Sequence, residues 1–302
     1  MFNYTPQTFY SEYKKCDPAC LITEGQKIAT TTLDAHGWDG KGERRADFSN
    51  PLTGPFVIEN AQVGDTLVVK IDSIKPLGGK GWSYAYPRPW LVEAADAALY
   101  PEKKSIEWRV DSESGFASAD FLPQGTVKIP LRPMLGCVGV ACKAGEAASS
   151  QQMGAFGGNL DFQLLNAGAQ LELPVMVPGG YLFVGDAHAV QFAGEITGAA
   201  VEVPAEVEFS VRLNKGKAIH WPWGETQEAL FTLGTGKPFE AAVQHAVSEM
   251  IYRLQRDYGL APAPAAQLTG PLGEIQACSL VSDSFSAACL ISKAALSALG
   301  RS

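Results

Sequence analysis

The sequence lacks any run of about 18 consecutive apolar residues, the length that a membrane-spanning helix needs. Its first residues, MFNYTPQTFYSEYKK, also lack the basic and apolar segments of a secretory signal. We therefore expect a protein that does not enter a membrane and that stays in the cytoplasm.

Positive charge is scarce as well. The chain has 24 Lys and Arg against 32 Asp and Glu, a net charge of -8, and no basic run that could displace the counterions of a nucleic acid. The glycine-rich phosphate-binding motifs G-x-G-x-x-G and G-x-x-x-x-G-K-[ST] are missing, which argues against a nucleotide ligand. This balance is compatible with a neutral substrate and excludes nucleic acid as an expected partner.

Cysteine is too sparse for a disulfide scaffold. The six cysteines, spread over 302 residues, are Cys16, Cys20, Cys137, Cys142, Cys278 and Cys289. The spacing of Cys16 and Cys20 could suit a metal, but no second close pair of Cys or His lies nearby in the sequence. We interpret the thiols as structural.

Turn-forming residues, by contrast, are abundant, with 31 Gly and 19 Pro, and they predict many short strands. Strand-like runs lie at residues 55–74, 125–140, 170–184 and 198–213. The first run resembles a hairpin around Gly64 and Asp65, and the third resembles a strand pair around Pro178. In the fourth, apolar residues alternate as in a half-buried strand.

One long helix is indicated at residues 238–258, where apolar residues keep a helical spacing. Pro238 suits an early helical position and Gly259 a C-terminal stop. Many strands followed by late helices predict an α+β protein, mainly β, with a sandwich-like β core. Because no internal repeat or low-complexity linker interrupts the sequence, we expect a single unit over residues 1–302.

Polar residues that suit chemistry are densest between residues 154 and 202, where they follow glycines at the predicted strand ends. They are Asn159, Asp161, Asp186, His188, Gln191, Glu195 and Glu202. Carboxylates with a histidine are the ligand types of a divalent metal, and a further carboxylate can act as general base. Polar residues beside glycines are also common turn formers, so the pattern leaves both interpretations open.

The stretch GGNLDFQLLNAGAQLELPVMVPGGYLFVGDAHAVQFAGEITGAAVE resembles the signature of the acetamidase/formamidase family. That signature has G-G-N-x-D before a strand, then P-V-x-V-P-G, then G-D-x-H-A-x-Q, and then G-E and an acidic residue. Two further segments match its patterns, PLTGPFVIENAQVGDTLVV at 51–69 and PLRPMLGCVGV at 130–140. Asp34 in TTLDA matches an early T-x-D-A. The likeness runs from about residue 25 to 295, so it covers nearly the whole chain.

The resemblance implies a β-rich homo-oligomer that hydrolyses a small amide such as formamide or acetamide. It also implies a divalent metal, zinc in the first place and calcium as an alternative, with Asp34, Asp161 and His188 as ligands. Glu195, or Glu202 as the alternative, would be the catalytic base, and Asn159 would stabilise the oxyanion. Gln191 and Asp186 would contact the substrate, and Cys142 would line the pocket.

The chain departs from the family pattern in two places. Ala141-Cys142 stands where the family usually has Ala-Pro, and segment 80–91 is unusually aromatic, which could reshape the pocket. Cys137 and Cys142, with Lys143 nearby, also suit a thiolate nucleophile, but the Glu and Lys of cysteine-dependent amidases are not found, which favours a packing role for Cys142. His36 is an alternative metal ligand, although a surface role is the simpler interpretation.

Two other functions stay open at this point. The chain could be a non-catalytic small-molecule-binding β module of the same fold, with tryptophans and tyrosines as a stacking surface. It could also hydrolyse another small or cyclic amide.

Overall fold

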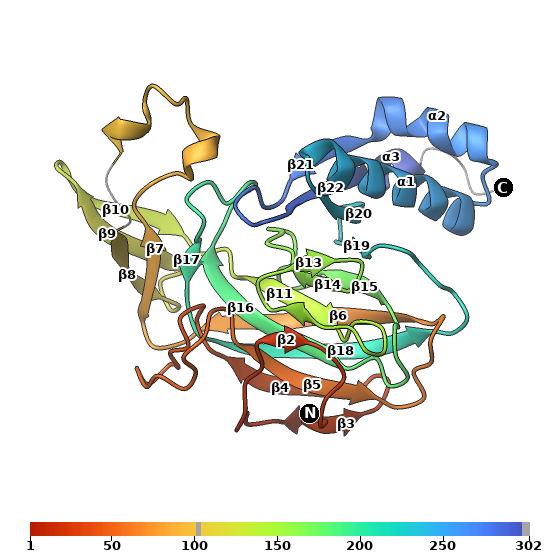
Figure 1. The fold of residues 1–302 in the computed structure, drawn as a ribbon, viewed down its shortest axis with the longest axis horizontal. Coiled ribbons are helices and arrows are strands. Elements are labelled where there is room, and N and C mark those ends of the chain that lie inside the picture. Colours follow the sequence, from red (N-terminus) through yellow and green to blue (C-terminus); the bar gives the residue numbers. More distant parts are fainter. Residues whose placement is uncertain (101–103, 298–302) are drawn as a thin grey trace.

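The computed structural model, which describes residues 1–100 and 104–297, consists of two large β-sheets with helices near the C-terminal end (Figure 1). Within these residues the first sheet has nine strands, in the order β1 (Phe2–Asn3), β4 (Lys27–Thr32), β18 (Ala205–Asn214), β6 (Thr66–Pro76), β15 (Gln170–Pro174), β19 (Trp223–Glu225), β20 (Ala229–Gly236), β22 (Phe285–Ser292) and β21 (Glu274–Ala277).

The second sheet carries the residues that matter for function. Its main path is β10 (Gly125–Pro130), β9 (Phe116–Leu122), β8 (Ser105–Asp111), β7 (Lys80–Tyr84), β17 (Val201–Glu202), β16 (Leu182–Val190), β11 (Met134–Val140), β14 (Gly157–Asn159) and β13 (Met153–Gly154). Strand β5 (Leu52–Ile58) pairs with β16, and β3 (Cys20–Ile22) pairs with β5. A small separate sheet joins β2 (Glu12–Tyr13) to β12 (Ala148–Ser149).

The two large sheets share one apolar core. Phe56 of the second sheet and Phe209 of the first meet edge to face at 5.2 Å, and both side chains are fully buried. All nine residues of β16 and all seven of β11 are buried, so polar side chains on these strands need partners inside the protein. The predicted fold class, mainly β with a sandwich-like core and late helices, is confirmed.

The predicted long helix is α1 (Phe239–Tyr258), which packs on the first sheet. Gly259 ends it in the left-handed conformation, at φ 66°, as the sequence indicated. Gly234 of β20 allows the close approach of α1, because a β-carbon at position 234 would come within 2.2 Å of the carbonyl oxygen of Ala242. The helix α2 (Pro262–Leu272) was not expected, and α3 (Lys293–Ser297) is a short turn of helix.

Two of the predicted strand pairings are wrong. Segment 55–74 does contain two strands, but β5 lies in the second sheet and β6 in the first. The same is true of β15 and β16 in segment 170–184. The Gly- and Pro-rich connections therefore carry the chain from one sheet to the other, whereas a hairpin would have returned it to the same sheet.

Strands β7 to β10 extend away from the sandwich, with the short helices η1 (Pro89–Leu91) and η2 (Ala97–Leu99) above them (Figure 1). This region contains the aromatic segment 80–91 that the sequence singled out. None of the helices described here is long and apolar enough to cross a membrane.

Candidate active site

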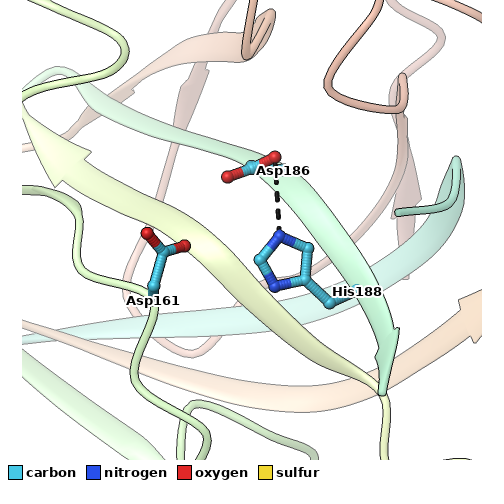
Figure 2. A group of neighbouring side chains, drawn as sticks. All are labelled: Asp161, Asp186 and His188. Atoms are coloured by element: carbon cyan, nitrogen blue, oxygen red, sulfur yellow. Dashed lines mark ion pairs between the residues drawn. The ribbon is translucent and has the colours of Figure 1, made fainter. Parts of the chain in front are cut away.

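Three potential metal ligands converge in the second sheet. Asp186 and His188 are two residues apart on β16, and Asp161 follows the end of β14. The ligand atoms of the three side chains all lie within 4.8 Å of one another, and Figure 2 shows Asp161 facing the Asp186–His188 pair across β11. All three residues are buried. The structure thus brings Asp161 and His188 together, as expected, with Asp186 as the third member.

Side-chain amides hold these three residues in place. Asn50 donates to Asp186 Oδ2 and to Asn159 Oδ1, both at 3.0 Å, and Asn159 Nδ2 donates to Asp161 Oδ2 at 2.9 Å. Asn159 thereby connects the loop before β5 to the carboxylate of Asp161.

Gln191 fixes the orientation of the histidine ring. Its Nε2 donates to the backbone oxygen of Asp161, so its Oε1 is the atom that accepts a hydrogen bond from His188 Nδ1. With the proton on Nδ1, the other ring nitrogen, Nε2, can offer a lone pair to a metal. We expected Gln191 to contact substrate, but its side chain instead hydrogen-bonds to Nδ1 of His188, a candidate metal ligand.

Two further carboxylates border the cluster. Glu202 Oε2 lies 3.2 Å from His188 Nε2, while its Oε1 accepts a hydrogen bond from the backbone N–H of Ala200. Glu195 accepts a hydrogen bond from Ser279 Oγ at 3.2 Å. Glu202 is buried and Glu195 is partly exposed, so the two candidate bases differ in their access to solvent.

The atoms that face the centre of the cluster have no hydrogen-bond partner. They are Asp161 Oδ1, Asp186 Oδ1, His188 Nε2 and Glu202 Oε2. A buried polar atom without a partner costs free energy, and several carboxylates around one point repel one another. A divalent cation between Asp161, Asp186 and His188, whose ligand atoms lie within 4.8 Å of one another, would satisfy these atoms and balance nearby negative charge, so the residues present fit a metal ion.

The protonation equilibria are consistent with a site that a cation would complete. Burial raises the pKa of Asp161 well above its usual range, and the charges of Glu195 and Asp186 add to this effect. Burial likewise raises the pKa of Glu202 to about 8 and raises the pKa of Glu195. Burial alone would lower the pKa of His188, but Glu202 and Asp186 raise it well above the ordinary value. Without a cation the cluster holds protons that a metal ion would displace.

Backbone strain gathers around the same cluster. Among the residues that the structure describes, six other than glycine have a left-handed φ, and four of them belong to this site: Asn50, Asp161, Asp186 and Glu195. Such conformations cost free energy and persist where the surrounding structure enforces them, often at functional sites.

A cavity of about 520 Å³ opens onto the cluster. One part of its wall is formed by polar residues of the cluster and its border, namely Asn159, Asp186, Glu195 and Glu202. Another part is formed by residues of β7 and of loops, namely His36, Trp82, Tyr84 and Arg88. A small molecule in this cavity would therefore meet Glu195, Glu202 and Asp186, the one candidate metal ligand that lines it.

Asp34 does not join the cluster. Its Oδ1 accepts hydrogen bonds from the backbone N–H groups of His36 and Trp38, both at 2.9 Å, and its Oδ2 accepts one from Trp82 Nε1 at 3.0 Å. Both oxygens are therefore already satisfied by the protein. His36 in turn stacks on Trp82 at 3.7 Å, so Asp34 supports the aromatic wall of the cavity and Asp186 takes the expected place of Asp34 among the ligands.

Cys142 is buried in the apolar core and is not among the residues that line the cavity. Burial, with a smaller contribution from Glu146, raises the pKa of its thiol to about 11, which opposes the thiolate that a nucleophile needs. The cysteine that touches the site is Cys137, whose Sγ lies 3.0 Å from Asn159 Oδ1.

Sequence reasoning also missed Asn50 and Gly136. Asn50 lies directly before the matched segment 51–69, and Gly136 ends the Pro-Met-Leu-Gly motif of the matched segment 130–140. Neither is an ordinary metal ligand or acid–base residue, and so neither was predicted.

Comparisons with known proteins indicate a family for the chain. The model of the acetamidase/formamidase family matches residues 44–153 and 143–250. A curated Schizosaccharomyces pombe protein that bears a formamidase name is 25% identical over 250 residues, which cover 64% of this chain. The chain spans 61% of the length of that relative.

Two solved structures are similar over nearly the whole chain. An acetamidase from Yersinia enterocolitica has a TM-score of 0.84 at 26% identity, and the match covers 98% of this chain and 92% of that one. A predicted acetamidase/formamidase from Thermoanaerobacter tengcongensis has a TM-score of 0.86 at 25% identity, with 100% and 98% covered.

Proposed function

The chain belongs to the acetamidase/formamidase family, and we propose that it hydrolyses the carbon–nitrogen bond of a small linear amide, giving a carboxylate and ammonia. The reaction takes place in the cavity beside Asp161, Asp186 and His188, the residues that would hold a divalent metal ion. The observation that carries this proposal is the convergence of the ligand atoms of Asp161, Asp186 and His188, which are buried within 4.8 Å of one another beside a cavity that Asp186 lines.

The ligand types favour zinc over calcium. Calcium prefers a shell made of oxygen atoms, whereas zinc binds imidazole nitrogen together with carboxylate oxygen. The imidazole Nε2 of His188 is central to the cluster, and the hydrogen bond from Nδ1 to Gln191 keeps the ring oriented for coordination. Glu202 Oε2 is placed to act as a fourth ligand or to support the histidine.

A bound divalent metal supplies acidification of water and polarisation of the amide carbonyl. Glu195 accepts the proton of the attacking water and returns it to the leaving nitrogen, because its partial exposure lets it reach substrate in the cavity. The Ser279 hydroxyl, which donates to Glu195 Oε2, holds that carboxylate in place. Asn159 Nδ2 has a second N–H besides the one given to Asp161, and it stabilises the oxyanion of the tetrahedral intermediate.

The test is ammonia release from a panel of linear amides and one cyclic amide. We expect turnover of linear amides by the purified protein, loss of turnover after chelation, and recovery on adding zinc. His188→Gln should abolish both metal binding and turnover. The control is His220→Gln, which should change neither, because His220 is exposed and does not line the cavity. A chelator-resistant enzyme with full activity would remove the metal from the mechanism. A protein that binds amides but releases no ammonia would be the binding module considered above.

A further inference from the structure

The aromatic segment that follows β7 contributes to the wall of the cavity and is hydrogen-bonded to two other loops. Trp90 Nε1 donates to the backbone oxygen of Leu280 at 2.8 Å, and the backbone N–H of Arg88 donates to Ile196 at 3.0 Å. These bonds connect the segment to the loop after β21 and to the loop that carries Glu195. Arg88 and Trp90 both line the cavity.

The guanidinium group of Arg88 lies close to Gly198 and to the ring of Trp90. Its Nη2 lies 3.4 Å from the backbone oxygen of Gly198, and its Cζ lies 5.9 Å from the centre of the Trp90 ring. Gly198 is necessary for this arrangement, because a β-carbon there would come within 2.1 Å of Arg88 Nε. A side chain confined by such neighbours loses less conformational entropy when it binds a ligand than a fully exposed one does.

Most of the hydrogen-bonding capacity of Arg88 is unused. Its Nε is buried without a hydrogen-bond partner, and its contact with Gly198 is long. Among the described residues Arg88 forms no ion pair with any acidic side chain, including Glu195, Glu202 and Asp283 of the same cavity. An arginine has five N–H donors arranged to bind a carboxylate through two parallel bonds.

The cavity also contains a second cation. Lys237 lines it, and its ammonium lies 5.3 Å from the centre of the Phe285 ring without an ion pair in the described part of the chain. The acidic residues that line the same cavity are Asp186, Glu195, Glu202 and the exposed Asp283, and in the described part of the chain none of them forms an ion pair with Arg88 or Lys237. A substrate with an anionic end would therefore meet in Arg88 a partly buried cation that has no acidic partner among the described residues.

We propose that Arg88 binds a carboxylate of the substrate, so that the amide hydrolysed is one whose acyl chain ends in a carboxylate. This inference rests on the proposed amidase function and narrows its substrate class. The amide end meets Glu195 and the metal ligands, and the acid end meets Arg88. The reaction then converts a monoamide of a dicarboxylic acid and water into the dicarboxylate and ammonium, and it breaks only the amide bond.

The test compares two amides of similar shape, succinamate and 4-methylpentanamide, in which an isopropyl group replaces the carboxylate. For the unaltered enzyme we expect kcat/KM for succinamate to exceed that for 4-methylpentanamide by at least about 10-fold, since hydrogen bonds to charged groups are the strong ones. Arg88→Met should lower kcat/KM for succinamate by about 10- to 100-fold, chiefly through KM, and should leave 4-methylpentanamide within about 3-fold.

Arg88→Lys, which keeps the charge but loses the bidentate geometry, should recover part of the loss. The matched control is Arg109→Met, because Arg109 is exposed on β8 and pairs with Asp120 outside this cavity. Equal efficiency on the two amides, or an equal loss on both in Arg88→Met, would overturn the inference.

Calorimetric binding of succinate separates this inference from the proposed function. Succinate that binds to the unaltered protein and not to Arg88→Met supports the carboxylate site even if no amide is turned over. Turnover of amides without any binding of succinate overturns the carboxylate site and leaves the amidase function standing.

Discussion

Gly136 lies so close to Asp161 that a β-carbon at position 136 would come within 2.6 Å of Asp161 Oδ1. The same β-carbon would come within 2.7 Å of Asp186 Oδ2. The strand β11 passes between the two carboxylates, and only glycine leaves room for both. The Pro-Met-Leu-Gly motif thus has a physical explanation at its last residue.

Gly136→Ala should therefore damage the site more than the fold. We expect the added methyl group to displace the two carboxylates, to lower the metal content and to reduce kcat/KM by at least about 100-fold, while overpacking costs about 1–3 kcal/mol in the free energy of unfolding. Metal analysis, amide kinetics and denaturant unfolding measure the three effects. Gly270→Ala, where the β-carbon would contact nothing, is the control. Normal metal content and turnover in Gly136→Ala would show that the carboxylates do not need their present positions.

Glu195→Gln tests the general base. Position 195 has a left-handed backbone, at φ 47°, which glutamine should adopt at about the same free-energy cost as glutamate. Glutamine can also still accept the hydrogen bond from Ser279. We expect metal and substrate to bind while kcat falls by about 10²–10⁴-fold, the usual share of general acid–base catalysis. Glu206→Gln, on the exposed side of β18, should behave like the unaltered protein. If the metal content falls together with kcat, Glu195 is a ligand, and if kcat is unchanged, Glu202 becomes the candidate base.

The sequence predicted the strands of this fold better than their pairing. Apolar alternation shows which face of a strand is buried, and it shows this correctly for β18, but it does not show which strand lies alongside. For that reason β5 and β6 were expected to form a hairpin although they lie in different sheets. The single unit over residues 1–302 and the homo-oligomer stay predictions.

The site was predicted from sequence motifs, and the errors of that prediction have physical causes. The residues between 157 and 202 that resemble the family signature do converge, because β14, β16 and β17 are close in one sheet. Asp34 looked equivalent to them in the sequence, but its oxygens are already bound by two backbone N–H groups and by Trp82. The hydrogen bond from Trp82 to Asp34 is visible only in the folded structure. The hydrogen bonds from Asn50 to Asn159 and Asp186 are likewise visible only there.

Cys142→Ala tests the rival covalent mechanism. Since Cys142 packs in the core and its thiol pKa is raised to about 11, we expect kcat/KM to stay within about 3-fold of the unaltered enzyme. The loss of the sulfur should lower the free energy of unfolding by about 1 kcal/mol through a small cavity. Amide kinetics and thermal unfolding provide the measurements, with Cys289→Ala, another buried thiol, as the control. Complete loss of turnover in a folded, metal-loaded Cys142→Ala variant would favour a thiolate nucleophile.

The metal-free protein should lose stability as the pH rises. The folded-state pKa of Glu202 is raised from 4.5 to about 8, and that of His188 is raised above 6.5, so in both cases the folded state binds protons more tightly than the unfolded state. Stability from such groups is present at low pH and is lost as the pH rises through the folded-state pKa. We therefore expect the Tm of the metal-free protein to fall between pH 5 and pH 8.

Zinc should reverse this trend, because a bound cation stabilises the ionised carboxylates and replaces the protons. The rise in Tm on adding zinc should accordingly be larger at pH 8 than at pH 5, and scanning calorimetry at the two pH values measures both shifts. Glu202→Gln removes one titrating group without changing the shape of the site, so it should flatten the pH dependence of the metal-free protein. A Tm that rises from pH 5 to pH 8 without metal would contradict the protonated cluster, and an equal effect of zinc at both pH values would show that the ion does not compete with these protons.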